Sequence, residues 1–159
     1  MKTAAFTLIE TILYLALFNI IFFVVITWAI SLAQNNRTAE YKNALEKNAI
    51  FVTSHLKDSF QEANSLDPAN STYNSDNGKV RVSKLASYKE YYLQNQVLKV
   101  TDGVNTHDLT DQFVHVTKFN VVPIQNALGT VTGANITVQF TAEKYPQLTK
   151  EIESYYAFR

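Results

Sequence analysis

Histidine and aspartate side chains gather in one short stretch of the chain, where they could bind a metal. The only such cluster comprises His107, Asp108, Asp111 and His115, and imidazole and carboxylate groups are common ligands of zinc. Residues 109–111, however, are typical of a strand connection, and His115 lies on the strand that we expect to follow. Because the four side chains then do not converge, we interpret them as solvated turn residues and predict neither a metal nor a cofactor.

The chain shows no arrangement that is typical of an enzyme. It has no Ser/His/Asp order, no carboxylate pair with flanking glycine turns and no phosphate-binding loop. It also has no cysteine, so neither disulfides nor thiolate ligands contribute to the fold. We therefore predict that the protein is not an enzyme.

The densest basic stretch of the chain is interleaved with aromatic residues. It contains Lys79, Arg81, Lys84 and Lys89, with three tyrosines beside them. Single-stranded nucleic acid is bound by such patterns, in which cations contact phosphates and aromatic rings stack on bases. Lysines also protect the edge strands of sheets from aggregation, and we favour this interpretation over DNA binding. The formal net charge of zero provides no general attraction for nucleic acid.

One carboxylate lies at the start of an apolar stretch that is long enough to cross a membrane. No charged residue occurs between Thr11 and Asn36, and a helix of about 20 apolar residues spans the hydrocarbon core. Glu10 is the only charged residue between Thr3 and Asn36. A carboxylate in a spanning segment costs about 2.5–3.5 kcal/mol near the bilayer centre and less towards an end. Its position therefore calls for a functional reason.

The residues around Glu10 resemble the type IV prepilin signature. A short leader ends in Ala5, and the letters FTLIE (residues 6–10) then open the apolar stretch. The resemblance implies that a prepilin peptidase cleaves between Ala5 and Phe6 on the cytoplasmic face and methylates the new amino group of Phe6. It also implies that Glu10 pairs with the amino terminus of a neighbouring subunit during assembly, which would offset part of the cost of burying the two charges.

Two departures from the common pattern of major pilins favour a minor pilin or a pseudopilin. No proline occurs before Pro68 to kink the helix, and no cysteine pair closes a C-terminal loop. The expected partners are other pilin or pseudopilin subunits, the prepilin peptidase, the assembly platform of the inner membrane and, before assembly, the membrane itself. The resemblance implies a single-pass protein of the cytoplasmic membrane with an extracytoplasmic C-terminal domain, which then enters a pilus or pseudopilus on the cell surface or in the periplasm.

The helical pattern continues beyond the apolar stretch. Apolar residues recur in steps of three and four on one face, at Tyr41, Leu45, Ala49, Val52, Leu56 and Phe60. This amphipathic half must pack on another element, and Asp67-Pro68 ends the helical region. We therefore divide the chain into a leader (1–5), a transmembrane and filament-core half-helix (6–36) and a globular domain (37–159).

The pattern after a polar loop at 67–78 is that of strands joined by tight connections. We expect strands at 79–84, 90–93, 97–100, 113–124, 136–142 and 151–158, with hairpin connections at 95–96, 102–103 and 128–134. In the fourth strand both faces carry apolar residues: Val114 and Val116 fall on one face, and Phe119 and Val121 on the other. We therefore expect this strand to be central.

Consecutive hairpins predict an antiparallel meander, one face of which can pack on the amphipathic half-helix. The predicted fold class is α+β, a long N-terminal helix packed by its distal half on an antiparallel sheet, as in pilins. The predicted function is that of a structural subunit of a filament related to type IV pili or type II secretion. Three alternatives stay open: a competence-type DNA-binding minor pilin, a major pilin and an uncleaved signal-anchored domain.

Overall fold

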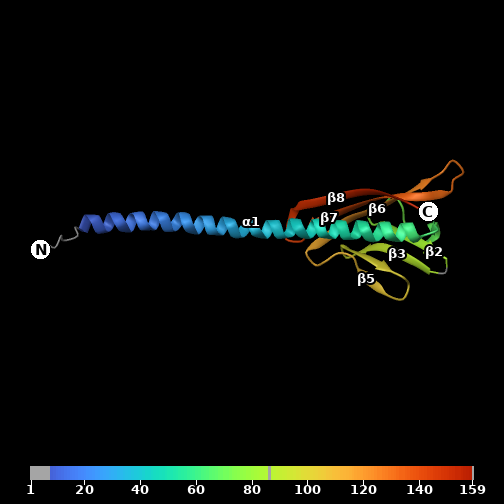
Figure 1. The fold of residues 1–159 in the computed structure, drawn as a ribbon, viewed down its shortest axis with the longest axis horizontal. Helices are drawn as coiled ribbons and strands as arrows, with labels where there is room; N and C mark the ends of the chain where they lie inside the picture. The colour runs from blue at the N-terminus through green and yellow to red at the C-terminus, as the bar shows by residue number, and fades with distance from the viewer. Residues whose placement is uncertain (1–7, 86, 159) are drawn as a thin grey trace. The chain divides into compact units, whose positions relative to one another are not determined.

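One long helix precedes eight strands in a computed structural model that describes residues 8–85 and 87–158 (Figure 1). The helix, α1, runs from Leu8 to Glu62. Two compact units divide the chain at residue 39, so the first part of α1 belongs to one unit and its last part to the other. The strands are β1 (Ser65–Leu66), β2 (Lys79–Lys84), β3 (Ser87–Gln94), β4 (Val97–Thr101), β5 (Thr106–Asp108), β6 (Val114–Gln125), β7 (Val131–Ala142) and β8 (Tyr145–Ala157).

The core of the second unit lies between α1 and antiparallel sheets. Its apolar residues on α1 are those that the spacing predicts: Tyr41, Leu45, Ala49, Val52, Leu56 and Phe60. The sheets contribute large buried side chains, among them Tyr91, Leu98, Phe119 and Phe140. In Figure 1, β6–β8 (orange to red) lie along one side of this part of α1 and β2–β5 (green to gold) along the other. The α+β fold class is therefore confirmed.

The strands form two sheets, whereas a single meander was expected. One sheet has the order β1-β2-β3-β4-β5 and the other β6-β7-β8, with antiparallel neighbours throughout. The chain leaves the first sheet after β5, where Asp111 is held against α1 rather than beside β5. Asn48 donates from Nδ2 to Oδ2 of Asp111 at 2.9 Å and accepts the Asp111 N–H at 3.0 Å. These bonds direct the chain towards the second sheet.

β6 lies at an edge of its sheet, so the expectation that it is central is wrong. A register shift occurs at Thr117, and the buried residues change from Val114 and Val116 before it to Phe119 and Val121 after it. The strand therefore has a single buried face. Apolar residues occupy both sets of alternate positions because one β-bulge lies between them. The central strand is β7.

The outer edge of β6 is covered by the loop that precedes β2. Asn74 N–H donates to the Val121 carbonyl at 3.0 Å, and Gly78 N–H donates to the Phe119 carbonyl at 2.7 Å. A Cβ atom at Gly78 would lie 2.4 Å from that carbonyl oxygen, so only glycine allows this close approach. The loop thus satisfies backbone groups that an open edge would leave unpaired.

The connections are partly those that the sequence predicts. Asn95 and Gln96 both have positive φ (52° and 63°), as a two-residue hairpin requires. Gly133, expected in a connection, lies instead within β7, where a Cβ atom would approach the Tyr156 carbonyl oxygen to 2.3 Å. β7 begins at residue 131 and β8 at residue 145, whereas starts at 136 and 151 were predicted. The connection between β6 and β7 is therefore limited to residues 126–130.

Candidate functional site

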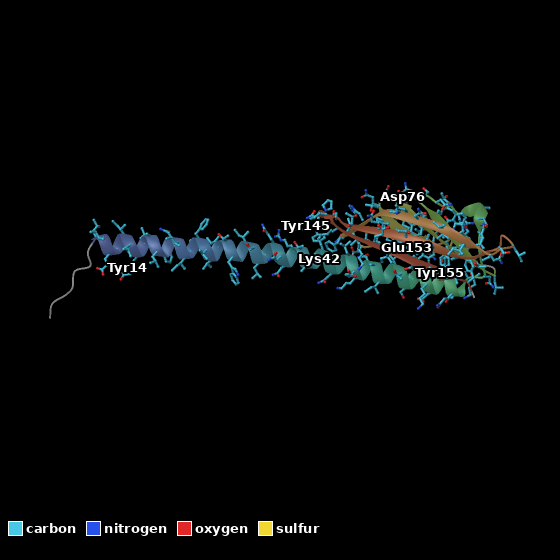
Figure 2. The ribbon with its side chains drawn as sticks, turned by 90° about the horizontal axis from the view of Figure 1, so that it is seen from above. Tyr14, Lys42, Asp76, Tyr145, Glu153 and Tyr155 are labelled. Atoms are coloured by element: carbon cyan, nitrogen blue, oxygen red, sulfur yellow. The ribbon has the colours of Figure 1, made fainter. Side chains whose placement is uncertain are left out.

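The part of α1 in the first unit presents a continuous apolar surface. Its large apolar side chains from Leu8 to Leu32 are between 41% (Ile26) and 78% (Leu8) exposed. An 18-residue window of the helix has a mean hydropathy of 2.4, and none of it is buried. Figure 2 shows side chains projecting from both sides of this segment as viewed, with Tyr14 labelled. A surface of this size is unfavourable in water, and the helix is long and apolar enough to serve as a single-pass membrane anchor.

Two threonine side chains of this segment bond to the helix itself. Thr27 donates from Oγ1 to the carbonyl of Phe23 at 2.8 Å, and Thr38 donates to the carbonyl of Gln34 at 3.1 Å. A hydroxyl that binds the carbonyl one turn earlier needs no water. These threonines are therefore compatible with an apolar environment around the helix.

Glu10, the predicted assembly residue, lies in the first turn of α1 and is exposed. The unsatisfied N–H groups of a helix N-terminus carry partial positive charge, which stabilises a carboxylate at this position. The predicted processing residues, Ala5 and Phe6, lie outside the described residues. Cleavage between them, and the pairing of Glu10 with an amino terminus, stay predictions.

Arg81, in the basic stretch, is held by an acidic partner on the neighbouring strand. It lies opposite Glu90 in the β2–β3 pair, and its guanidinium approaches Glu90 Oε2 to 2.6 Å. Lys79 lies 3.6 Å from the other oxygen of the same carboxylate. The guanidinium is also 4.3 Å from the ring centroid of Tyr88. Because Glu90 is buried, its charge would be costly without these two cations.

The other two basic residues also have partners within the chain. Lys84 forms an ion pair with Glu62 of α1 at 3.3 Å, and Lys89 donates to Ser59 Oγ at 3.2 Å. The first pair is exposed on both sides and is worth little. Binding of a phosphate by these four residues would require them to exchange intramolecular partners, which makes a structural role of the basic stretch the simpler interpretation.

A polar cluster between α1 and β3 was missed by the sequence analysis. The Tyr91 hydroxyl donates to Ser59 Oγ at 2.5 Å and lies 2.8 Å from His55 Nδ1. Burial and the nearby Lys89 ammonium lower the pKa of His55 although Asp58 opposes them, and burial raises the pKa of Tyr91. Neutral side chains thus join helix and sheet. The sequence feature that could have revealed this cluster is the polar pair His55 and Ser59, which lie four positions apart beside the apolar face of the helix.

The histidine and aspartate cluster is dispersed over two sheets. His107 lies on β5 and His115 on β6, while Asp108 pairs with a lysine of β4 at 2.6 Å and Asp111 bonds to Asn48. Within residues 8–85 and 87–158, no group of three or more His, Cys, Asp and Glu side chains is placed to hold a metal ion. The structure therefore brings none of these residues together as a site.

Comparison with known proteins assigns no family to the chain. No protein-family model, curated protein or solved structure matches it. Its function must therefore be inferred from its own residues and fold.

Proposed function

We propose that the protein is a membrane-anchored subunit of a filament related to type IV pili or type II secretion pseudopili. The observation that carries this proposal is the division of α1 into two chemically different parts. The part before residue 39 exposes apolar side chains on all sides, and the part after it buries one face in a folded domain. A subunit with this division can be stored in a membrane and later packed among the helices of its neighbours.

The chemistry of assembly follows from the apolar part of α1. In the membrane its side chains contact lipid, and in a filament they would contact equivalent helices, so neither state exposes them to water. Packing of apolar helices alone fixes axial position weakly. The Glu10 carboxylate, placed against the amino group of a neighbouring subunit, would fix the axial position of the helix. Other axial positions would separate the two buried charges, which is strongly disfavoured.

The N-terminus of the mature protein tests the prepilin interpretation. We expect the protein isolated from its own host to begin at Phe6 and to carry a methyl group on its α-amino nitrogen, because residues 1–10 resemble a prepilin cleavage site. Intact-mass and N-terminal peptide mass spectrometry of the membrane and filament fractions would measure both features. Assembled protein that retained Met1 would contradict the proposal and favour an uncleaved signal-anchored domain.

A further inference from the structure

Strand β8 presents the longest open edge in the described part of the molecule. It is 13 residues long and lies at the edge of the β6-β7-β8 sheet. The opposite edge of that sheet, β6, is covered by the loop before β2. The edges of the other sheet, β1 and β5, have only two and three residues. β8 is thus the strand with room for a further strand beside it.

The register shows which backbone groups of β8 face outward. Phe158 N–H donates to the Thr132 carbonyl at 3.1 Å, in line with the pairing of β7 and β8. Opposed residues in an antiparallel pair alternate between bonded and non-bonded positions. Every second residue from Phe158 back to Lys150, before the register shift at Thr141, therefore bonds to β7. The N–H and C=O groups of the residues between them, including Glu151, Glu153 and Tyr155, point away from the sheet.

A groove of about 470 Å³ lies between α1 and the last part of β8. The Phe60 ring lies at its base and stacks on Phe158, with ring centroids 5.6 Å apart. The Tyr156 ring is 5.2 Å from Phe60. Thr53 and Lys57 of α1 line the groove as well. The groove is therefore apolar at its base and lies beside the open backbone edge.

A second, smaller groove of about 270 Å³ lies between α1 and the first part of β8. It is lined by Leu45 and Leu148 among others, and the pair between Glu46 and Lys150, at 2.7 Å, joins its two walls. Figure 2 shows Tyr145, Glu153 and Tyr155 along β8, beside the part of α1 that follows Lys42. Space for apolar side chains thus accompanies β8 at both ends.

The exposed face of β8 carries two carboxylates on alternate residues, Glu151 and Glu153. Glu151 is 52% exposed and lies 3.8 Å from Lys118, while Glu153 accepts a hydrogen bond from Asn135. A second copy of the protein could pair with this edge about a two-fold axis between residues 151 and 153. Glu151 of one copy would then lie opposite Glu153 of the other, and like charges placed opposite each other are destabilising. Lysine or arginine at alternate positions of an added strand would instead form favourable cross-strand pairs.

We propose that the open edge of β8, together with the two grooves between it and α1, binds an extended segment of a partner protein as an added strand. Basic side chains of that segment lie opposite Glu151 and Glu153, and its apolar side chains enter the grooves. Main-chain hydrogen bonds supply the attachment, and the alternate side chains supply the selectivity. This binding does not depend on the role of the chain in a filament.

Binding of a model strand by the full-length protein in zwitterionic detergent micelles tests the proposal. The probe is a fluorescein-labelled peptide of alternating valine and lysine, seven residues long, and fluorescence anisotropy measures its saturation. We expect the same peptide N-methylated at alternate residues to bind at least about tenfold more weakly, because it cannot donate to the β8 edge. Its charge and side chains are unchanged, so micelle binding alone would affect both peptides equally.

A second peptide and two protein variants separate the elements of the proposal. A valine and glutamate peptide is expected to bind at least about tenfold more weakly than the lysine peptide. Glu153→Pro removes an outward N–H and the carboxylate that accepts from Asn135, but no main-chain bond to β7, and it should weaken binding of the lysine peptide, whereas Glu143→Gln, outside β8, should not. Equal binding of the methylated and unmethylated peptides would overturn strand addition. Equal binding of the acidic and basic peptides would overturn the basic partner.

Discussion

Removal of residues 1–33 should leave a folded, water-soluble domain, whereas removal of residues 1–63 should abolish folding. The shorter deletion removes the exposed apolar surface before residue 33 and keeps every core residue of α1. The longer one also removes Val52, Leu56 and Phe60, which are at most 1% exposed. Loss of a single such side chain costs about 2–5 kcal/mol, and a whole domain is stable by only about 5–15 kcal/mol. The sheets should therefore not fold without α1.

Urea denaturation followed by circular dichroism distinguishes the two fragments. The fragment 34–159 should unfold in one cooperative transition, and the fragment 64–159 should show none. Within the longer fragment, Leu56→Ala should lower the free energy of unfolding by about 2–5 kcal/mol. Ile50→Ala is the matched control, because Ile50 is 68% exposed on the same helix and should change it by at most about 0.5 kcal/mol. A cooperative transition in the fragment 64–159 would contradict the packing of helix on sheets as the basis of stability.

Replacement of Glu10 by glutamine should leave expression, membrane insertion and leader cleavage nearly unchanged while it depletes the protein from filaments. The carboxylate is tolerated near the end of a membrane span, and the neutral amide is tolerated there as well. In a filament, loss of one partner of a buried ion pair costs about 3–5 kcal/mol, and each 1.4 kcal/mol is about a tenfold change in equilibrium. We therefore expect the filament pool to fall by at least roughly a hundredfold.

Quantitative immunoblots of membrane and sheared-filament fractions measure this depletion. Glu10→Asp should have a milder effect, because the charge is kept on a shorter side chain. Glu40→Gln, a change of the same kind beyond the apolar part of α1, should behave as the wild type. Wild-type amounts of the glutamine variant in the filament pool would refute the pairing role for a shaft subunit. A subunit at the tip has no neighbour ahead of it, so the same result would then favour a tip position.

The helix was predictable in detail and the sheets only in part. The buried face of α1 follows from spacing alone because a helix repeats regularly over many residues. In β6 the same reasoning failed at Thr117, where one bulge moves the buried face to the other set of alternate residues. β1 and β5, two and three residues long, are too short to show alternation. Sequence does show edge strands through proline, since Pro123 and Pro146 lie in β6 and β8, and none lies in central β7.

The candidate sites differ in how far sequence could define them. The apolar segment is recognisable without a structure because length and composition decide whether a helix can span a membrane. The basic stretch needed the structure, since the pairing of Arg81 with Glu90 depends on strand register. Neither source tests the proposed pairing of Glu10 with a neighbouring subunit, which stays a prediction. The groove beside β8 joins residues about 100 positions apart, which no local pattern reveals.

The order of contacts along the chain has a consequence for how the domain folds. Each sheet consists mainly of hairpins between consecutive strands, and such local contacts form quickly. The contacts of α1 join distant residues: Asn48 and Asp111 are 63 positions apart, and Glu46 and Lys150 are 104 apart. Loop-closure entropy delays contacts of this kind. Docking of α1 should therefore be the late step, so Leu56→Ala in the fragment 34–159 should accelerate unfolding in stopped-flow experiments and change the refolding rate little.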